Sequence, residues 1–342
     1  MIFLNDAEIR NNLFPITLTR HTALIRIGIL TIMQKWEQLL GQEVFLSAAE
    51  GRVEVPANII PTKENYKEIL LLAESKTAIL QTDKIKIIVY PWHIFQLNEY
   101  ALHEDYKILT SKLSSQKIEE TNKVISKEKI FIGKNVQMEH CILNASTGPI
   151  FIDDNAIVQE GALIRGPFYL GKNSVVKMGT RIFGATTIGD SCVVGGEIKN
   201  SVIFDYSNKA HDGYLGDSVL GSWCNLGAGT SNSNIKNTAG EVAIQINDNA
   251  YKINVGIKAG LIMGDYSRAA INTSFNTGTV VGVCCNILGI DFPPKFIENF
   301  SWGNIKYDFE KAIEHIQNWM SLKNKKITEN EIQILKNLYS QK

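Results

Sequence analysis

One histidine of the chain stands in a context that suits chemistry better than packing. His211 lies in the segment NKAHDGY, among small and polar residues and beside a glycine, which excludes a place in a hydrophobic core. A neutral imidazole takes up a proton near pH 7 and can act as a general base. Glu197 and Asp212 are carboxylates that could orient it. A solvated surface imidazole is the alternative interpretation, and the sequence pattern does not decide between the two.

The elements that position His211 follow a six-residue period. Aliphatic residues recur at every sixth position from Ile152 to Val194, and mostly small residues form a second series four positions later. This period matches neither the α-helix, with about 3.6 residues per turn, nor the two-residue alternation of a strand. It is typical of a coil of short parallel strands that turns a corner after each repeat. The sequence therefore predicts a hexapeptide-repeat parallel β-helix.

Two interruptions of the period, at residues 197–214 and 225–240, are the places where we look for function. Insertions in repeat proteins tend to collect on the working face. The break in the six-residue period near residue 199 predicts a loop or a longer turn. Residues 241–255 predict a hairpin whose turn falls at residues 247–249, and a last aliphatic series follows from Ile257.

Composition and charge narrow the class of protein. The 342 residues are 44% hydrophobic and carry no net charge, so the basic face of a nucleic-acid binder is not expected. The five cysteines form no CxxC pair, which favours buried free thiols over a metal site or disulfides. A signal peptide and a run of about 18 apolar residues are both missing. We therefore expect a cytoplasmic protein with no membrane partner and no resident metal.

The chain divides into four expected segments. A mixed α/β region covers residues 1–115, and a polar, lysine-rich linker covers 116–129. The β-helix is expected over 130–292. A helical tail is expected over 293–342, with two amphipathic helices in FEKAIEHIQNWMSL and ENEIQILKNLY.

Several sequence blocks carry a resemblance to a known family. They include VVKMGTRIFGATTIG, VIFDYSNKAHDGYLGDSVLG and INTSFNTGTVVGV, within residues 2–303. The repeats resemble the left-handed β-helix acyltransferases. More narrowly, the blocks are similar to the Bacteroidetes-type variant of the bifunctional UDP-N-acetylglucosamine diphosphorylase/glucosamine-1-phosphate N-acetyltransferase. The resemblance implies a left-handed parallel β-helix behind a small nucleotidyltransferase-like α/β domain, and assembly as a homotrimer.

The resemblance also implies roles for residues at matching positions. His211 falls on the catalytic histidine of the family, and Glu197 falls on the carboxylate that orients it. Arg181, Lys199 and Tyr214 fall on ligands of the sugar phosphate. Arginine and lysine suit a phosphate dianion because they donate charge-assisted hydrogen bonds.

Four further residues match the part of the site that handles the acetyl group. Asn225 and Asn234 fall on residues that position the amino sugar and the acetyl group. Ala228, with Gly229 beside it, falls where the backbone meets acetyl-CoA. Amide groups of Asn225 or of this backbone could also stabilise a developing oxyanion.

The front of the chain departs from the family pattern. The usual glycine-rich segment that holds a triphosphate is absent before residue 60. The candidate nucleotide-binding cations are Arg20, Arg26 and Lys35. The region is also short, and Asp83 is a lone candidate for Mg²⁺, which we expect only if this domain is active. We interpret the domain as a reduced, inactive relative of a uridylyltransferase.

These observations predict an N-acetyltransferase that moves the acetyl group of acetyl-CoA directly to an amino-sugar phosphate or a nucleotide-linked amino sugar, with His211 as general base. Two alternatives stay open. The first is a sugar-1-phosphate nucleotidyltransferase that uses Arg20, Arg26 and Lys35. The second is a non-catalytic, sugar-nucleotide-binding trimer.

Overall fold

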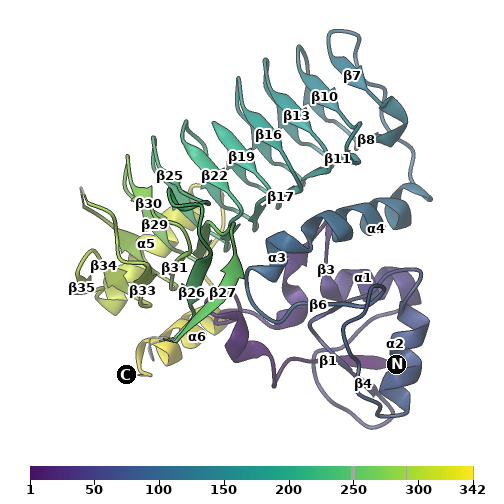
Figure 1. Cartoon of the computed structure of the whole chain (residues 1–342), viewed down its shortest axis with the longest axis horizontal. Coiled ribbons are helices and arrows are strands. Elements are labelled where there is room, and N and C mark those ends of the chain that lie inside the picture. The colour runs from purple at the N-terminus through teal and green to yellow at the C-terminus, as the bar shows by residue number, and fades with distance from the viewer. Residues whose placement is uncertain (248–250, 290, 342) are drawn as a thin grey trace.

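A three-sided coil of short parallel strands forms the body of the molecule (Figure 1). The computed structural model describes residues 1–247, 251–289 and 291–341. Each coil adds one strand to each side, so that Ile152 pairs with Leu170 and Leu170 pairs with Ile188. These three residues belong to the predicted aliphatic series, and all are fully buried inside the coil. The expected left-handed parallel β-helix is confirmed.

The strands of the coil fall on three sides, which we number in chain order. The first side consists of β7 Lys123–Ile125, β10 Ile142–Asn144, β13 Leu163–Arg165, β16 Arg181–Phe183, β19 Glu197–Lys199, β22 Tyr214–Gly216, and the pair β25 Ser231–Asn232 and β30 Ser274–Phe275. The second side consists of β8 Ile130–Ile132, β11 Ile150–Ile152, β14 Phe168–Leu170, β17 Thr186–Ile188, β20 Val202–Ile203, β23 Val219–Leu220, β28 Leu261–Met263, β31 Thr279–Val281 and β33 Phe296–Ile297. The third side consists of β9 Gln137–Met138, β12 Ile157–Val158, β15 Val175–Val176, β18 Val193–Val194, β21 Asn208–Lys209, β24 Asn225–Leu226, β29 Arg268–Ala269, β32 Asn286–Ile287, β34 Ser301–Trp302 and β35 Ile305–Lys306.

The break in the period near residue 199 is a shortened coil, and the expected loop or longer turn is wrong. Val176 pairs with Val194, eighteen positions later, whereas Val194 pairs with Lys209, only fifteen positions later. The strands continue without an insertion, so the turns on either side must pack more closely. This close packing is possible because glycines stand at positions 195 and 196.

The β-helix also extends past both boundaries that the sequence suggested. Strand β7 lies inside the expected linker and pairs with β10. Strands β33 and β34 lie inside the expected tail and pair with β31 and β32. The polar segment at residues 116–129 can still supply a strand, because the outward-pointing side chains of β7 are exposed to solvent.

The predicted hairpin is present as β26 Val242–Gln245 and β27 Lys252–Gly256, which pair antiparallel. Its expected turn at residues 247–249 lies largely outside the described residues. Val242 and Ile244 are fully buried and join a core shared with the N-terminal region.

The N-terminal region is a small α/β unit that covers the second side of the coil (Figure 1). Its strands are β1 Ile2–Asn5 with β4 Val53–Pro56, β2 Arg26–Ile27 with β3 Leu30–Thr31, and β5 Ile59–Ile60 with β6 Lys86–Ile87. Its helices are α1 Ile32–Leu40, α2 Tyr66–Glu74, α3 His93–Gln96 and α4 Asn98–Thr110, and the short 3₁₀ turns are η1 Arg10–Leu13, η2 Thr22–Leu24 and, at the start of the coil, η3 Lys127–Lys129. Its buried side chains pack directly on Val202, Phe204 and Val219 of the coil.

Two helices close the chain, as the sequence predicts. Helix α5 spans Phe309–Ser321 and α6 spans Glu329–Tyr339. Thr328 and Glu331 form a capping box that satisfies free amide groups at the start of α6. Both helices pack where the second and third sides of the coil meet, against Trp223, Tyr266 and Phe300. Among the described residues, no helix combines the length and apolar character needed to cross a membrane.

Candidate functional site

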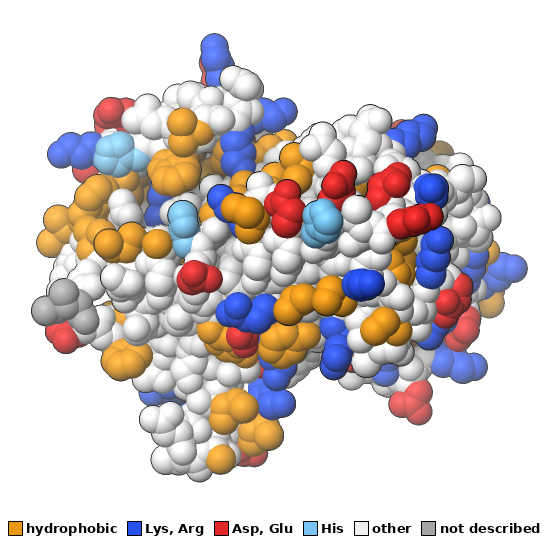
Figure 2. Space-filling view, turned by 90° about the horizontal axis from the view of Figure 1, so that it is seen from above, with side chains coloured by type: hydrophobic (Ala, Val, Ile, Leu, Met, Phe, Trp, Pro, Cys, Tyr) orange, Lys and Arg blue, Asp and Glu red, His pale blue; other side chains and the backbone are white. Residues whose placement is uncertain are grey.

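A column of polar side chains crosses three neighbouring strands of the first side. Arg181, Glu197 and Tyr214 open β16, β19 and β22, and the parallel register places them side by side. Adjacent strands lie about 4.8 Å apart, so the three side chains share one patch. The guanidinium Nε of Arg181 lies 3.4 Å from a carboxylate oxygen of Glu197, and both side chains stay partly exposed. Figure 2 views this side of the molecule and shows basic, acidic, histidine and hydrophobic side chains close together.

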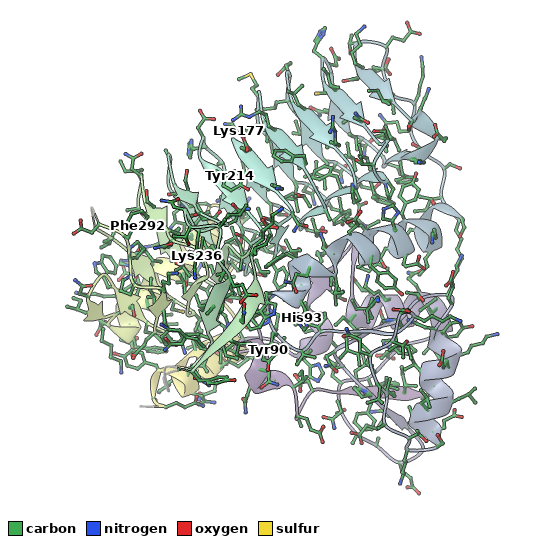
Figure 3. The ribbon with its side chains drawn as sticks, viewed as in Figure 1. Tyr90, His93, Lys177, Tyr214, Lys236 and Phe292 are labelled. Atoms are coloured by element: carbon green, nitrogen blue, oxygen red, sulfur yellow. The ribbon has the colours of Figure 1, made fainter. Side chains whose placement is uncertain are left out.

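Tyr214 and Asn234 meet at the next coil. Burial and the charges of Asp217 and Glu197 raise the pKa of Tyr214 to about 12, so its hydroxyl keeps its proton at neutral pH. The Asn234 amide donates to Tyr214 and to the buried carboxylate of Asp217. Asn200 also donates to Asp217, over 2.6 Å. Asp217 therefore holds this corner of the patch in place, and Tyr214 presents a hydroxyl there. Figure 3 shows where Tyr214 lies on the coil.

His211 lies in the turn that joins the third side to the first, between β21 and β22, and it is exposed. Within the described part of the chain, its imidazole makes no hydrogen bond or ion pair, and the Glu197 carboxylate pairs with Arg181 instead. The backbones of the two turns nevertheless touch. A Cβ added at Gly196 would lie 2.8 Å from the carbonyl oxygen of His211. The structure thus brings His211 beside Glu197 without joining the two side chains.

A buried lysine holds the His211 turn from inside the coil. Lys209 occupies the inward position that Val194 fills one coil earlier, and only 2% of its surface is exposed. Its ammonium donates to the carbonyl oxygen of Gly195 over 3.1 Å and to that of His211. Burial lowers the pKa of Lys209 to about 8, against the opposing charge of Asp212. Sequence reasoning missed this residue, although a lysine at an aliphatic position of the repeat could have revealed it.

The residues expected to meet the acetyl donor lie on both sides of the same corner. Ala228 and Gly229 form the turn stacked on that of His211, and the Gly229 amide donates to the Asp212 carbonyl over 3.0 Å. Asn225 lies on the third side, in register with Arg268, and not in the column of Arg181. A ligand that touches every predicted residue must therefore wrap around the edge where the third side meets the first.

The candidate nucleotide-binding cations are all engaged by carboxylates. Arg20 pairs with Asp265, and the guanidinium of Arg26 lies 3.2 Å from an oxygen of Asp205.

The third candidate, Lys35, pairs with Asp105 where both side chains are at most 1% exposed. A triphosphate would have to displace all three of these partners. The structure uses these cations to hold the N-terminal region together and to fasten it to the coil.

Metal and thiol chemistry find little support in the described residues. No group of three or more His, Cys, Asp or Glu side chains gathers there to hold a metal ion. All five cysteines are free and buried, as the sequence predicts. Burial raises the pKa of Cys192 to about 12, which makes it a poor nucleophile near neutral pH.

Comparisons with known proteins agree with the resemblance seen in the sequence. Residues 1–50 match a family model described as a sugar nucleotidyl transferase. The chain is 34% identical to the bifunctional protein GlmU of Methanococcus maripaludis over 242 residues, which cover 67% of this chain and 55% of the relative. It is 27% identical over 230 residues to a bifunctional sugar-1-phosphate nucleotidylyltransferase/acetyltransferase of Sulfurisphaera tokodaii, covering 64% of this chain and 50% of the relative.

Among solved structures, the chain is similar to a Francisella novicida UDP-N-acetylglucosamine acyltransferase at 16% identity and a TM-score of 0.23, covering 65% of this chain and 83% of that one. A TM-score this low has no bearing on function. The chain spans about half the length of the relatives from Methanococcus and Sulfurisphaera. The expected resemblance to GlmU-type proteins with a left-handed β-helix is confirmed.

Proposed function

Starting from a β-helix of the GlmU type, we propose that this protein transfers an acetyl group from acetyl-CoA to the amine of an amino sugar that carries phosphate. The observation that carries the proposal is the column of Arg181, Glu197 and Tyr214 beside the exposed turn of His211. It supplies one cation for a phosphate, a hydroxyl donor for a sugar and an exposed imidazole that could act as a general base.

The reaction needs one proton acceptor and no covalent enzyme intermediate. The sugar amine attacks the carbonyl carbon of the thioester, the carbon–sulfur bond breaks, and the His211 imidazole takes the proton that the nitrogen loses. The protonated His211 then gives this proton to the leaving thiolate of CoA, which restores the neutral imidazole. Asn225 and the backbone of the turn at Ala228 are placed at the same edge and would donate to the oxyanion that forms.

In this mechanism Glu197 would orient the imidazole of His211 once the acceptor has bound. Its carboxylate now pairs with Arg181, and a phosphate dianion arriving at Arg181 would compete for that guanidinium. The released carboxylate lies one turn from His211 and could then orient the imidazole and stabilise its protonated form. Acceptor binding would therefore assemble the base.

We also propose a homotrimer, the assembly that the resemblance to the left-handed β-helix acyltransferases implies. Light scattering of the purified chain tests this assembly. A monomer at the concentrations where the protein is active would contradict it.

The test of the function is His211→Asn, assayed by release of CoA thiol from acetyl-CoA with glucosamine 1-phosphate and with UDP-glucosamine. We expect kcat to fall at least about 100-fold, the scale that general-base catalysis supplies. The matched control is His140→Asn, an exposed histidine in another turn of the coil with a φ of 54°, which asparagine tolerates. Equal turnover by His211→Asn and the unmutated protein would remove the mechanism.

The alternatives make different predictions. A surviving nucleotidyltransferase would release pyrophosphate from UTP and magnesium with a sugar phosphate, and the ion pairs of Arg20, Arg26 and Lys35 speak against it. A non-catalytic binder would be stabilised by a sugar nucleotide in a thermal-shift assay but not by acetyl-CoA.

A further inference from the structure

Next to the column lies a groove that bears on which acceptor is used. We propose that the acceptor is a nucleotide-linked amino sugar, and that its nucleoside diphosphate part lies in this groove. The inference rests on the proposed function, because it places the amino sugar of the acceptor at His211 and the nucleoside diphosphate of the same acceptor in the groove.

The groove lies along the first side of the coil and reaches the start of α4 at Glu99. It has a volume of about 670 Å³, within the range of about 300–1,000 Å³ that small-molecule sites occupy. Its lining includes Ile142, Leu163, Arg165, Pro167, Arg181 and Phe183, and Glu99 of α4 reaches it from the N-terminal region. The walls therefore combine apolar surface with two guanidinium groups.

Groove and column are continuous, because Arg181 belongs to both. A second column runs parallel to the first, two residues further along each strand. Phe183 pairs with Lys199 in this column, and Arg165 follows the Ile164–Ile182 pair and so stands one strand before Phe183. With strands about 4.8 Å apart, the sequence of side chains is cation, aromatic ring, cation.

Among the described residues, the groove and the second column together hold Arg165, Arg181 and Lys199 against the single carboxylate of Glu99, and this excess of positive charge fits a diphosphate. Arg165 and Lys199 form no ion pair with any carboxylate in the described part of the chain, and the Lys199 ammonium lies 5.9 Å from the centre of the Phe183 ring. A monophosphate needs only Arg181 and Lys199, which leaves Arg165 unused. A diphosphate between Arg181 and Lys199 would leave the nucleoside over Phe183, where a base can stack on the ring, with Arg165 beside it.

The three candidate nucleotide-binding cations of the N-terminal region are not free to receive a diphosphate. Arg20, Arg26 and Lys35 are each engaged by a carboxylate. The nucleotide part of a substrate is therefore better matched by the first side of the coil than by the nucleotidyltransferase-like region.

Isothermal titration of the full chain with UDP tests the proposal. We expect UDP to bind, and Arg165→Ala and Phe183→Ala each to weaken it at least tenfold. The matched control is Lys123→Ala, which removes an exposed cation of the same side two strands beyond Arg165. We also expect kcat/KM to be higher for UDP-glucosamine than for glucosamine 1-phosphate, with Arg165→Ala narrowing that difference.

The outcomes separate the two proposals. Acetyl transfer to glucosamine 1-phosphate without UDP binding overturns the groove assignment and leaves the proposed function intact. UDP binding that Arg165→Ala and Phe183→Ala weaken, with no transfer to either acceptor, supports the groove and overturns the acetyltransferase. Groove variants that change the oligomeric state but not UDP binding overturn the assignment in favour of a contact between copies of this chain.

Discussion

Replacement of Lys209 by methionine separates folding from catalysis. Methionine fills a similar volume without a charge, so the coil keeps its inward side chain. Two effects on stability oppose each other. Burial lowers the pKa of Lys209 from 10.5 to about 8, and at ~1.4 kcal/mol per pKa unit the buried charge costs the folded state about 3 kcal/mol. The carbonyls of Gly195 and His211 lose their charged donor, at about 1.5–3 kcal/mol each.

The two effects offset each other in large part, so Lys209→Met should lower the free energy of unfolding at pH 7 by no more than about 3 kcal/mol. The pH dependence gives a sharper signature. The folded pKa of Lys209 lies below that of the unfolded chain, so the unfolded chain binds the proton more tightly between pH 8 and 10.5. The unmutated protein therefore gains up to about 3 kcal/mol of stability over that interval, and Lys209→Met lacks this gain. Urea unfolding at pH 7 and pH 10 measures the change in the free energy of unfolding for each protein. Subtracting the change in Lys209→Met from that in the unmutated protein removes the contribution of all other titrating groups.

We expect Lys209→Met to affect activity more strongly than stability. Without the ammonium, the turn of His211 is no longer tied to the turn that leads into Glu197, and a displacement of about 1 Å costs a general base up to roughly 100-fold. We expect kcat in the acetyl-transfer assay to fall at least tenfold with little change in KM. Full activity in Lys209→Met, or a loss of stability well above 3 kcal/mol at pH 7, would refute this reasoning.

Two further variants test the interior of the structure. Lys35→Met leaves the buried carboxylate of Asp105 without its cation, with the backbone amides of Ile29 and Leu30 still donating to it. This variant should destabilise the chain by about 3–5 kcal/mol in urea unfolding, whereas Lys35→Met with Asp105→Asn should recover part of that loss, because the asparagine oxygen can still accept from those amides without a buried charge. Equal stability of Lys35→Met and the parent would contradict this. Gly213→Ala should destabilise the chain, because Gly213 has a φ of 123° and a Cβ there would lie 2.1 Å from the carbonyl oxygen of Thr230. It should also lower kcat, because Gly213 lies next to the turn of His211. A thermal unfolding midpoint unchanged from the parent would contradict this.

Much of the candidate site follows from local sequence, but its geometry does not. The types of Arg181, Glu197 and Tyr214 are readable from the chain. They form a common column because Arg181 and Glu197 are sixteen positions apart and Glu197 and Tyr214 are seventeen apart, and a strict count of six would have placed them differently. Hydrogen bonding between coils sets that register, and no single repeat contains the information.

The six-residue period alone determined the β-helix, because every coil needs one inward aliphatic side chain at each corner-to-corner strand. The terminal helices also follow from local pattern, since their caps and apolar stripes lie within a few residues of one another. The partners of the buried cations were decided only by the tertiary structure. Arg26 meets Asp205 and Arg20 meets Asp265 across long stretches of chain, and a cation reads the same in sequence whether it faces a phosphate or a carboxylate. Ion pairs form between groups that the fold brings close together, and the sequence alone does not show which groups these are.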